Sequence, residues 1–229
     1  MTFAVLAAVS VPRLFAITVE VGDGESEAVK IAAENLRIDI ARACPNHAKD
    51  SRRIVVRTKA GGPWESSTRT YANGVWTVTG ADRRGTVYGI YAISDELGVS
   101  PFHWMDDIPV AQCEKFDLST KTKDRRAPVK YRGIFINDEG WCLRSWAVHN
   151  YEKDGTKSLG SKSYEKIFEL VLRCRLNVIW PARCIRSIRT SAETAGDGGR
   201  TTLRSKGALT TLTSSALGLW NASRGFTRT

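Results

Sequence analysis

The pattern of apolar and polar positions predicts an α/β arrangement in the first half of the chain. Residues 17–21 suit a strand, and residues 25–43 carry apolar side chains at the spacing of a helix. Residues 54–57 and 75–79 are short β-rich runs, and the Gly, Ser and Thr-rich residues 61–70 between them are typical of a loop. These elements predict a small domain of two layers.

A second helix is expected to begin near Thr86 and to end at Gly98, with Val87, Ile90, Tyr91 and Leu97 facing inward. In the first helix, the same pattern predicts that Asp39 points outward. Residues 101–109 form an aromatic and acidic loop, which we interpret as a packing plug between domains, although such a loop could also contact a sugar ring. Residues 121–126 are interpreted as a charged linker.

A β-α-β unit is predicted after this linker. Residues 133–136 form an apolar run without polar alternation, which is typical of a strand buried on both faces. Residues 164–175 have the period of a helix that Ser163 is placed to cap, and residues 176–180 suit a second strand. A connection this long predicts parallel pairing, so the polar residues 137–139 are expected at the edge where α/β proteins place their active sites.

Composition and charge narrow the possible functions. The 229 residues carry a net charge of +10, and no run of 18 apolar residues suggests a membrane span. Residues 183–229 contain eight basic and two acidic residues, so most of the positive charge belongs to this last segment. A nucleic-acid binder driven by that segment is a possible alternative, but no stacking surface or known motif supports it.

The cysteines and histidines do not predict a metal site. The five cysteines lack any Cys-x-x-Cys spacing, so we expect neither a zinc site nor a full disulfide framework, and we interpret them as buried or incidental thiols. The three histidines are isolated in the sequence. Neither residue type indicates a catalytic or ligand role.

Several segments, in order and spacing, together resemble a known family. The clearest are Asp-Arg-Arg-Gly-Thr-Val-Tyr-Gly-Ile-Tyr at 82–91, Tyr-Arg-Gly-Ile-Phe-Ile-Asn-Asp-Glu at 131–139, Tyr-Glu-Lys-Ile-Phe-Glu-Leu at 164–170 and Asn-Val-Ile-Trp-Pro-Ala at 177–182. Shorter matches lie at 98–102, 104, 107–109, 141–143 and 146–147. With these segments the chain resembles glycoside hydrolase family 115, the α-glucuronidases of xylan.

The resemblance implies a fold and a reaction. The fold class is α/β, with an N-terminal α/β domain over residues 1–128 (core 17–120) and the first two strands and first helix of a (β/α)8 barrel over residues 129–182. The implied reaction is inverting removal of glucuronic or 4-O-methyl-glucuronic acid from glucuronoxylan or its oligosaccharides. No metal or organic cofactor, nucleic acid or membrane partner is implied, and an extracellular location is expected because a xylan polymer is met outside the cell.

The candidate site residues follow the first predicted barrel strand. Inverting hydrolysis needs two carboxyl groups about 6.5–9.5 Å apart, so the adjacent Glu139 and Asp138 are expected to supply one of the pair, with Glu139 the main candidate. Asn137 is expected to shape the pocket through hydrogen bonds. Trp141 and Trp146 are candidates for substrate binding, where they could stack on sugar or pack underneath. The alternative is that residues 137–140 are only a polar strand exit.

The family pattern does not continue through the last segment. A barrel of this type needs about 250 residues, and residues 183–229 are rich in Ser and Thr without a sustained period. We interpret the chain as truncated, with residues 183–229 a disordered tail or the product of misread coding sequence, and we expect no useful activity from it. The alternative function is a non-catalytic carbohydrate-binding or interaction module that retains only the N-terminal domain.

Overall fold

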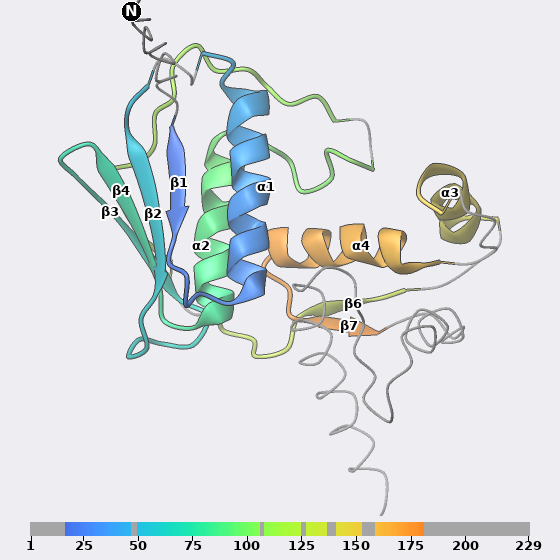
Figure 1. The fold of residues 1–229 in the computed structure, drawn as a ribbon. Coiled ribbons are helices and arrows are strands. Elements are labelled where there is room, and N and C mark those ends of the chain that lie inside the picture. The colour runs from blue at the N-terminus through green and yellow to red at the C-terminus, as the bar shows by residue number, and fades with distance from the viewer. Residues whose placement is uncertain are drawn as a thin grey trace, which may run out of the picture.

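The computed structural model describes residues 17–46, 50–105, 108–124, 127–136, 141–152 and 159–180. Within these ranges the larger sheet has five strands, in the spatial order β1 (Thr18–Val21), β2 (Arg53–Thr58), β4 (Val75–Gly80), β3 (Ser67–Ala72) and β5 (Lys121–Asp124). Helices α1 (Glu27–Ala43) and α2 (Arg83–Glu96) lie side by side against one face of this sheet (Figure 1). The chain is therefore mixed α/β, with a sheet layer and a helix layer.

The core between these layers follows from the apolar spacing read in the sequence. Strands β1, β2 and β4 pair in parallel, and their inward side chains Val19, Ile54 and Val78 are buried. Leu36 and Ile90 cover them from α1 and α2 and are also fully buried. Removing these side chains from water is the main stabilising contribution to this part of the chain.

The loop predicted for residues 61–70 is wrong in its second half, because Ser67 begins strand β3. This strand pairs antiparallel with β4 through a two-residue turn at Asn73 and Gly74, whose φ angles of 50° and 78° are those of the Asn-Gly hairpin turn. The strand is polar on both faces, with Arg69 buried and Thr68 exposed. The spacing of apolar residues could not reveal strand β3, but the Asn73-Gly74 pair indicated a hairpin turn at its end.

Helix α2 begins three residues earlier than predicted. Asp82 is its N-cap residue, and the Asp82 carboxylate accepts a hydrogen bond of 2.8 Å from the backbone N–H of Gly85. The second carboxylate oxygen accepts a 2.7 Å hydrogen bond from the backbone N–H of Glu65. The predicted inward positions Val87, Ile90, Tyr91 and Leu97 are all buried, which confirms the face assigned to this helix.

The charged linker predicted at residues 121–126 is partly wrong. Residues 121–124 form β5, which pairs antiparallel with β3 at the edge of the sheet. Lysine side chains are common on edge strands because they hinder pairing with another chain, so the charge that suggested a linker also suits this position.

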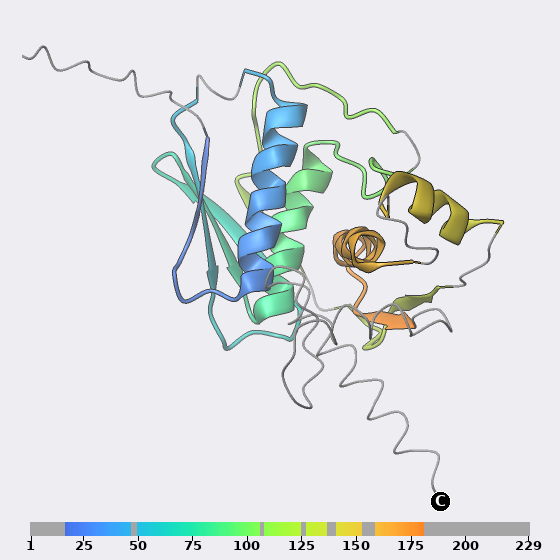
Figure 2. The same ribbon diagram turned by 45° about the vertical axis from the view of Figure 1, so that its right-hand side comes forward.

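A second unit contains the strands β6 (Gly133–Phe135) and β7 (Val178–Trp180), which pair in parallel. Helix α4 (Ser161–Arg173) precedes β7 and lies over this pair (Figure 2). Ile136 and Ile179 pack with Ile167 and Val171 of α4 in one buried cluster. The predicted β-α-β order and the parallel pairing are confirmed, and the element boundaries agree with the prediction to within three residues.

One helix of this unit was not predicted, and one predicted helix cap is wrong. The connection after β6 contains a short helix, α3 (Leu143–Asn150), which the sequence did not predict. Ser163 does not cap α4, because Gly160 is the N-cap residue and Ser163 is the third residue of the helix. Within the described ranges no helix has the length and apolar character needed to cross a bilayer.

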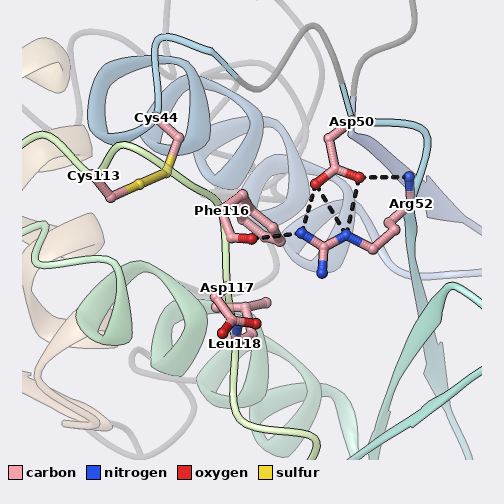
Figure 3. Close-up of a disulfide and its surroundings, with 7 residues drawn as sticks. All are labelled: Cys44, Asp50, Arg52, Cys113, Phe116, Asp117 and Leu118. Atoms are coloured by element: carbon pink, nitrogen blue, oxygen red, sulfur yellow. Dashed lines mark hydrogen bonds and ion pairs between the residues drawn. A yellow bond between two sulfur atoms is a disulfide. The ribbon is translucent and has the colours of Figure 1, made fainter.

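A disulfide joins Cys44, at the end of α1, to Cys113, and this contradicts the interpretation of both residues as incidental thiols (Figure 3). The two cysteines are 69 residues apart in the sequence, and the backbone N–H of Cys113 donates a 2.7 Å hydrogen bond to the carbonyl of Ala43. Nearby, Arg52 pairs with Asp50 at 2.6 Å and donates to the carbonyl of Phe116 at 2.5 Å. These contacts attach the segment after α2 to the end of α1 through Cys113 and to the residues before β2 through Phe116.

Replacing Cys44 and Cys113 by serine is expected to lower the free energy of unfolding by about 4 kcal/mol, since the disulfide closes a long loop in the unfolded chain. Urea unfolding followed by circular dichroism measures the change. Cys142→Ser, at an exposed free cysteine, is the matched control and should change stability little. Equal stability of the double variant and the wild-type protein would contradict the structural role of this disulfide.

Candidate functional site

The edge at which the candidate site was predicted is defined by the ends of β6 and β7. Because the two strands are parallel, the chain leaves both of them at the same edge of the sheet, after Ile136 and after Trp180. Asn137, Asp138 and Glu139 follow Ile136 directly but lie outside the described residues. Their predicted roles therefore stay predictions.

The two candidate tryptophans beyond this edge differ in their surroundings. Trp141 is 84% exposed. Trp146, in α3, is half-buried, with its ring 5.8 Å from that of Trp104 and 5.4 Å from that of Tyr151. Trp104 belongs to the aromatic loop before β5, so this loop packs against α3, which agrees with its interpretation as a packing plug.

A buried carboxylate connects the end of α3 to the start of α4. Glu152 is 3% exposed, and its Oε1 atom accepts hydrogen bonds from the backbone N–H of Ser163 at 2.7 Å and from the Ser163 hydroxyl at 2.9 Å. A negative charge is favourable here, because the first N–H groups of a helix have no partner within the helix. A Cβ atom at Gly160 would lie 2.6 Å from Glu152 Oε2, so only glycine leaves room for this carboxylate.

A second buried carboxylate lies at the opposite ends of β6 and β7. The side chain of Glu65 is 1% exposed and pairs with Arg84 at 3.0 Å and Arg132 at 2.7 Å. Its Oε1 atom also accepts a 2.8 Å hydrogen bond from the side-chain amide of Asn177. Glu65 has a φ angle of 57°, a left-handed backbone conformation that residues other than glycine rarely adopt.

Two of the partners of Glu65 are the residues that precede the two strands. Arg132 precedes β6 and Asn177 precedes β7, and the amide oxygen of Asn177 accepts a 2.9 Å hydrogen bond from the backbone N–H of Arg132. The Arg132 guanidinium also donates to the carbonyl of Arg175 at 2.7 Å. Tyr88 of α2 donates a 3.0 Å hydrogen bond to the carbonyl of Leu176. Burial, followed by the charge of Glu65, raises the pKa of Tyr88, so this hydroxyl stays a neutral donor.

Helices α1 and α4 are joined by a buried ion-pair network. Arg173 bonds to Asp39 at 2.8 Å and to Glu169 at 2.8 Å, while Lys166 pairs with Glu169 at 3.1 Å. The Arg173 guanidinium also lies 4.6 Å from the ring centre of Tyr91. The prediction that Asp39 points outward is wrong, since Asp39 is 1% exposed.

The charges in this network shift the ionisation of its members. Burial alone would raise the pKa of Glu169, but the positive charges of Arg173 and Lys166 outweigh it and hold this pKa below its ordinary value. Burial likewise acts to lower the pKa of Arg173, but the hydrogen bond to Asp39 and the negative charges of Asp39 and Glu169 together outweigh burial and raise this pKa. Both shifts favour the charged forms of Glu169 and Arg173 at neutral pH.

Sequence reasoning missed the buried residues Glu65, Glu152, Asp39 and Arg173. Glu65 and Glu152 lie in segments without a regular period, and their partners are remote in the sequence. A signal existed for Asp39, which is three residues after Leu36 and directly before Ile40 on the apolar face of α1. In the described part of the chain no group of three His, Cys, Asp or Glu residues could hold a metal ion.

The comparisons with known proteins point to one family. The profile described as glycosyl hydrolase family 115 matches residues 124–201. Among solved structures, a family GH115 4-O-methyl-α-glucuronidase with specificity for decorated arabinogalactans is 32% identical with a TM-score of 0.63, and the match covers 73% of this chain. None of the curated proteins matches significantly.

The extent of these matches is limited. This chain spans 25% of the length of that glucuronidase. A GH138 enzyme targeting pectin rhamnogalacturonan II matches at 14% identity and a TM-score of 0.46, too low to carry an argument. The family match ends at residue 201, beyond the domain boundary that the sequence predicted at residue 183. That boundary stays a prediction.

Glu65→Gln is expected to destabilise the protein by about 3–5 kcal/mol, because it leaves the partly buried guanidinium groups of Arg84 and Arg132 without their buried counter-charge. Urea unfolding gives the free energy, and hydrogen exchange at β6 and β7 shows where protection is lost. Glu34→Gln is the matched control: its ion pair with Arg37 is exposed and contributes less than about 1 kcal/mol. Equal effects of the two substitutions would contradict the role of Glu65.

The contribution of Glu169 should depend on pH. Its folded pKa lies below the ordinary value of 4.5, so the stability it provides is fully present above pH 4.5 and is lost as the pH falls through the folded pKa. Glu169→Gln is therefore expected to be less stable than the wild type at neutral pH, with a difference that shrinks below pH 4.5. Urea unfolding of both proteins at a series of pH values measures this difference. A difference that stays constant with pH would argue against the ionised network.

Proposed function

The chain is related to glycosyl hydrolase family 115, and on that premise we propose that it provides the N-terminal α/β domain and the start of the catalytic barrel of an inverting α-glucuronidase. The observation that carries the proposal is the 32% identity to a 4-O-methyl-α-glucuronidase over 73% of this chain. Because the chain spans 25% of that enzyme, activity belongs to the assembled catalytic domain and not to these strands alone.

The exposed face of the β6 and β7 pair supports a barrel. One face packs against α4 through Ile136 and Ile179. On the residues leading into and along β6, alternate side chains Val129, Tyr131 and Phe135 are exposed although they are large and apolar. In a (β/α)8 barrel such side chains would face the interior and be covered by further strands. A structure of an assembled barrel in which these three stay in solvent would count against the proposal.

The proposed catalytic and pocket residues are those that directly follow β6. Glu139 is proposed as one carboxyl group of the catalytic pair, with Asp138 beside it and Asn137 hydrogen bonding within the pocket. The second carboxyl group would come from another barrel strand, because inverting hydrolysis separates the two by about 6.5–9.5 Å. Because Asp138 and Glu139 are adjacent in the sequence, they are poorly suited to form this separated pair by themselves.

Trp141 is proposed to bind the sugar ring and Trp146 to support it. Trp141 is exposed near the edge where Glu139 is expected, and an indole offers a large rigid apolar surface to a sugar. Trp146 packs against Trp104 and Tyr151, so it fixes α3, which begins two residues after Trp141.

The proposed substrate is a polysaccharide that carries 4-O-methyl-glucuronic or glucuronic acid, with glucuronoxylan as the first choice and a decorated arabinogalactan as the second. We also propose an extracellular location. The disulfide between Cys44 and Cys113 favours an oxidising compartment, and such polymers occur outside cells. Free thiols at both positions in the native protein, detected by alkylation and mass spectrometry, would argue against export.

A chimera tests the catalytic role. The segment of the arabinogalactan-specific glucuronidase that matches this chain is replaced by the corresponding residues of this chain, and release of 4-O-methyl-glucuronic acid is measured. Glu139→Gln in the chimera is expected to lower turnover by at least about 100-fold, the usual loss when a general acid or base is removed. The 229-residue chain alone is expected to release no uronic acid.

The matched control is Glu165→Gln, at an exposed position of α4, which should leave turnover unchanged. If the chimera carrying Glu139→Gln were as active as the unsubstituted chimera, Glu139 would have no catalytic role. Activity in the unsubstituted 229-residue chain would overturn the need for further barrel strands.

A further inference from the structure

A groove of about 490 Å³ lies between α1, the aromatic loop before β5, the end of α3 and α4. Its walls include Arg42, His103, Trp104, Tyr151 and Lys166, and they do not include Trp141. The α4 residues in its wall are not those that pack on β6 and β7, so the groove is on the other face of this helix. The volume falls in the range of small-ligand sites, about 300–1,000 Å³.

The charges in the groove leave one positive group unmatched. Arg173 and Lys166 are neutralised by Asp39 and Glu169, which are bonded to them. Arg42 is exposed and has no ion pair within the described residues. An arginine in this setting can bind a carboxylate through two parallel hydrogen bonds.

The aromatic wall of the groove provides complementary groups for hydroxyls and an apolar ring face. The rings of Trp104 and Tyr151 are 6.0 Å apart at 76°, which presents an angled aromatic surface. The indole Nε1 of Trp104 is shielded from solvent and lacks a hydrogen-bond partner among the described residues, so a ligand hydroxyl could accept from it. His103 Nδ1 lies 2.8 Å from the carbonyl of Ser100, so in the neutral ring Nδ1 is the donor and Nε2 is left as an acceptor.

We propose that this groove is a binding site for a uronic acid unit of an acidic polysaccharide. The sugar carboxylate pairs with Arg42, the ring lies against Trp104 and Tyr151, and hydroxyl groups bond to Trp104 Nε1 and His103 Nε2. The identification of the ligand as a sugar acid rests on the proposed function. A second contact to the same polymer would increase the residence of the polymer on the protein without taking part in the reaction.

The test measures binding to the 229-residue chain by calorimetry and by NMR of the tryptophan indole N–H groups. The probes are a xylo-oligosaccharide bearing 4-O-methyl-glucuronic acid, the same oligosaccharide without the acid, and inorganic phosphate. Arg42→Gln is expected to weaken binding of the acidic oligosaccharide roughly tenfold or more, as for the loss of a charged hydrogen bond. The Trp104 signal, assigned with Trp104→Phe, is expected to shift with the acidic oligosaccharide.

The matched control is Lys30→Gln, which removes an exposed positive charge from the same helix away from the groove and should leave affinity unchanged. Equal affinity of Arg42→Gln and wild type, equal binding of the neutral oligosaccharide, or no binding of the acidic one overturns the proposal. Competition by phosphate with the same affinity also overturns it, because it would show a simple anion site.

These outcomes separate the groove from the proposed active site. Loss of binding in Trp141→Ala with no effect of Arg42→Gln rejects the groove and leaves the proposed function standing. An effect of Arg42→Gln together with full activity of the Glu139→Gln chimera supports the groove and rejects the catalytic proposal.

Discussion

The arrangement of the described chain depends on one buried carboxylate, that of Glu65. It comes from the loop before β3 and holds Arg132 and Asn177, the residues that lead into β6 and β7. A carboxylate shielded from water is stable only with such partners, because its desolvation costs several kcal/mol. Removing one partner of a buried pair destabilises a protein by about 3–5 kcal/mol. The position of the second sheet relative to the first therefore follows from this contact.

A second junction, between Asp39 of α1 and Arg173 of α4, fixes the helix that covers β6 and β7. Helix α4 consequently has two different faces. Ile167 and Val171 pack on the strands, while Lys166, Glu169 and Arg173 face α1 and the groove. The beginnings of the strands and their covering helix are thus held by α1, α2 and the loop before β3, and the opposite strand ends lead toward Glu139, the residue proposed for catalysis. In the proposed barrel, this division would follow the rule that one end of a barrel serves stability and the other serves chemistry.

Much of the fold could be predicted from local patterns. The parallel pairing of β6 and β7 and the buried face of α2 were found because apolar residues recur with the period of the element that buries them. Strands β3 and β5 were missed because their pairing is made by polar and charged residues such as Thr68 and Lys121, which carry no such period. For the candidate site, the sequence located the strand end that precedes Asn137 and the exposed Trp141, but it could not separate the packing of Trp146 from a binding role.

The sequence alone therefore determined the element types, the parallel β-α-β unit and the family resemblance, since each depends on neighbouring residues or on motif order. Only the tertiary structure decided which polar residues are buried together: Cys44 with Cys113, Asp39 with Arg173, and Glu65 with Arg132. Such pairs join residues that are between 67 and 134 positions apart. Their burial is favourable only when both partners arrive at the same place, and no local pattern records where a distant partner will lie.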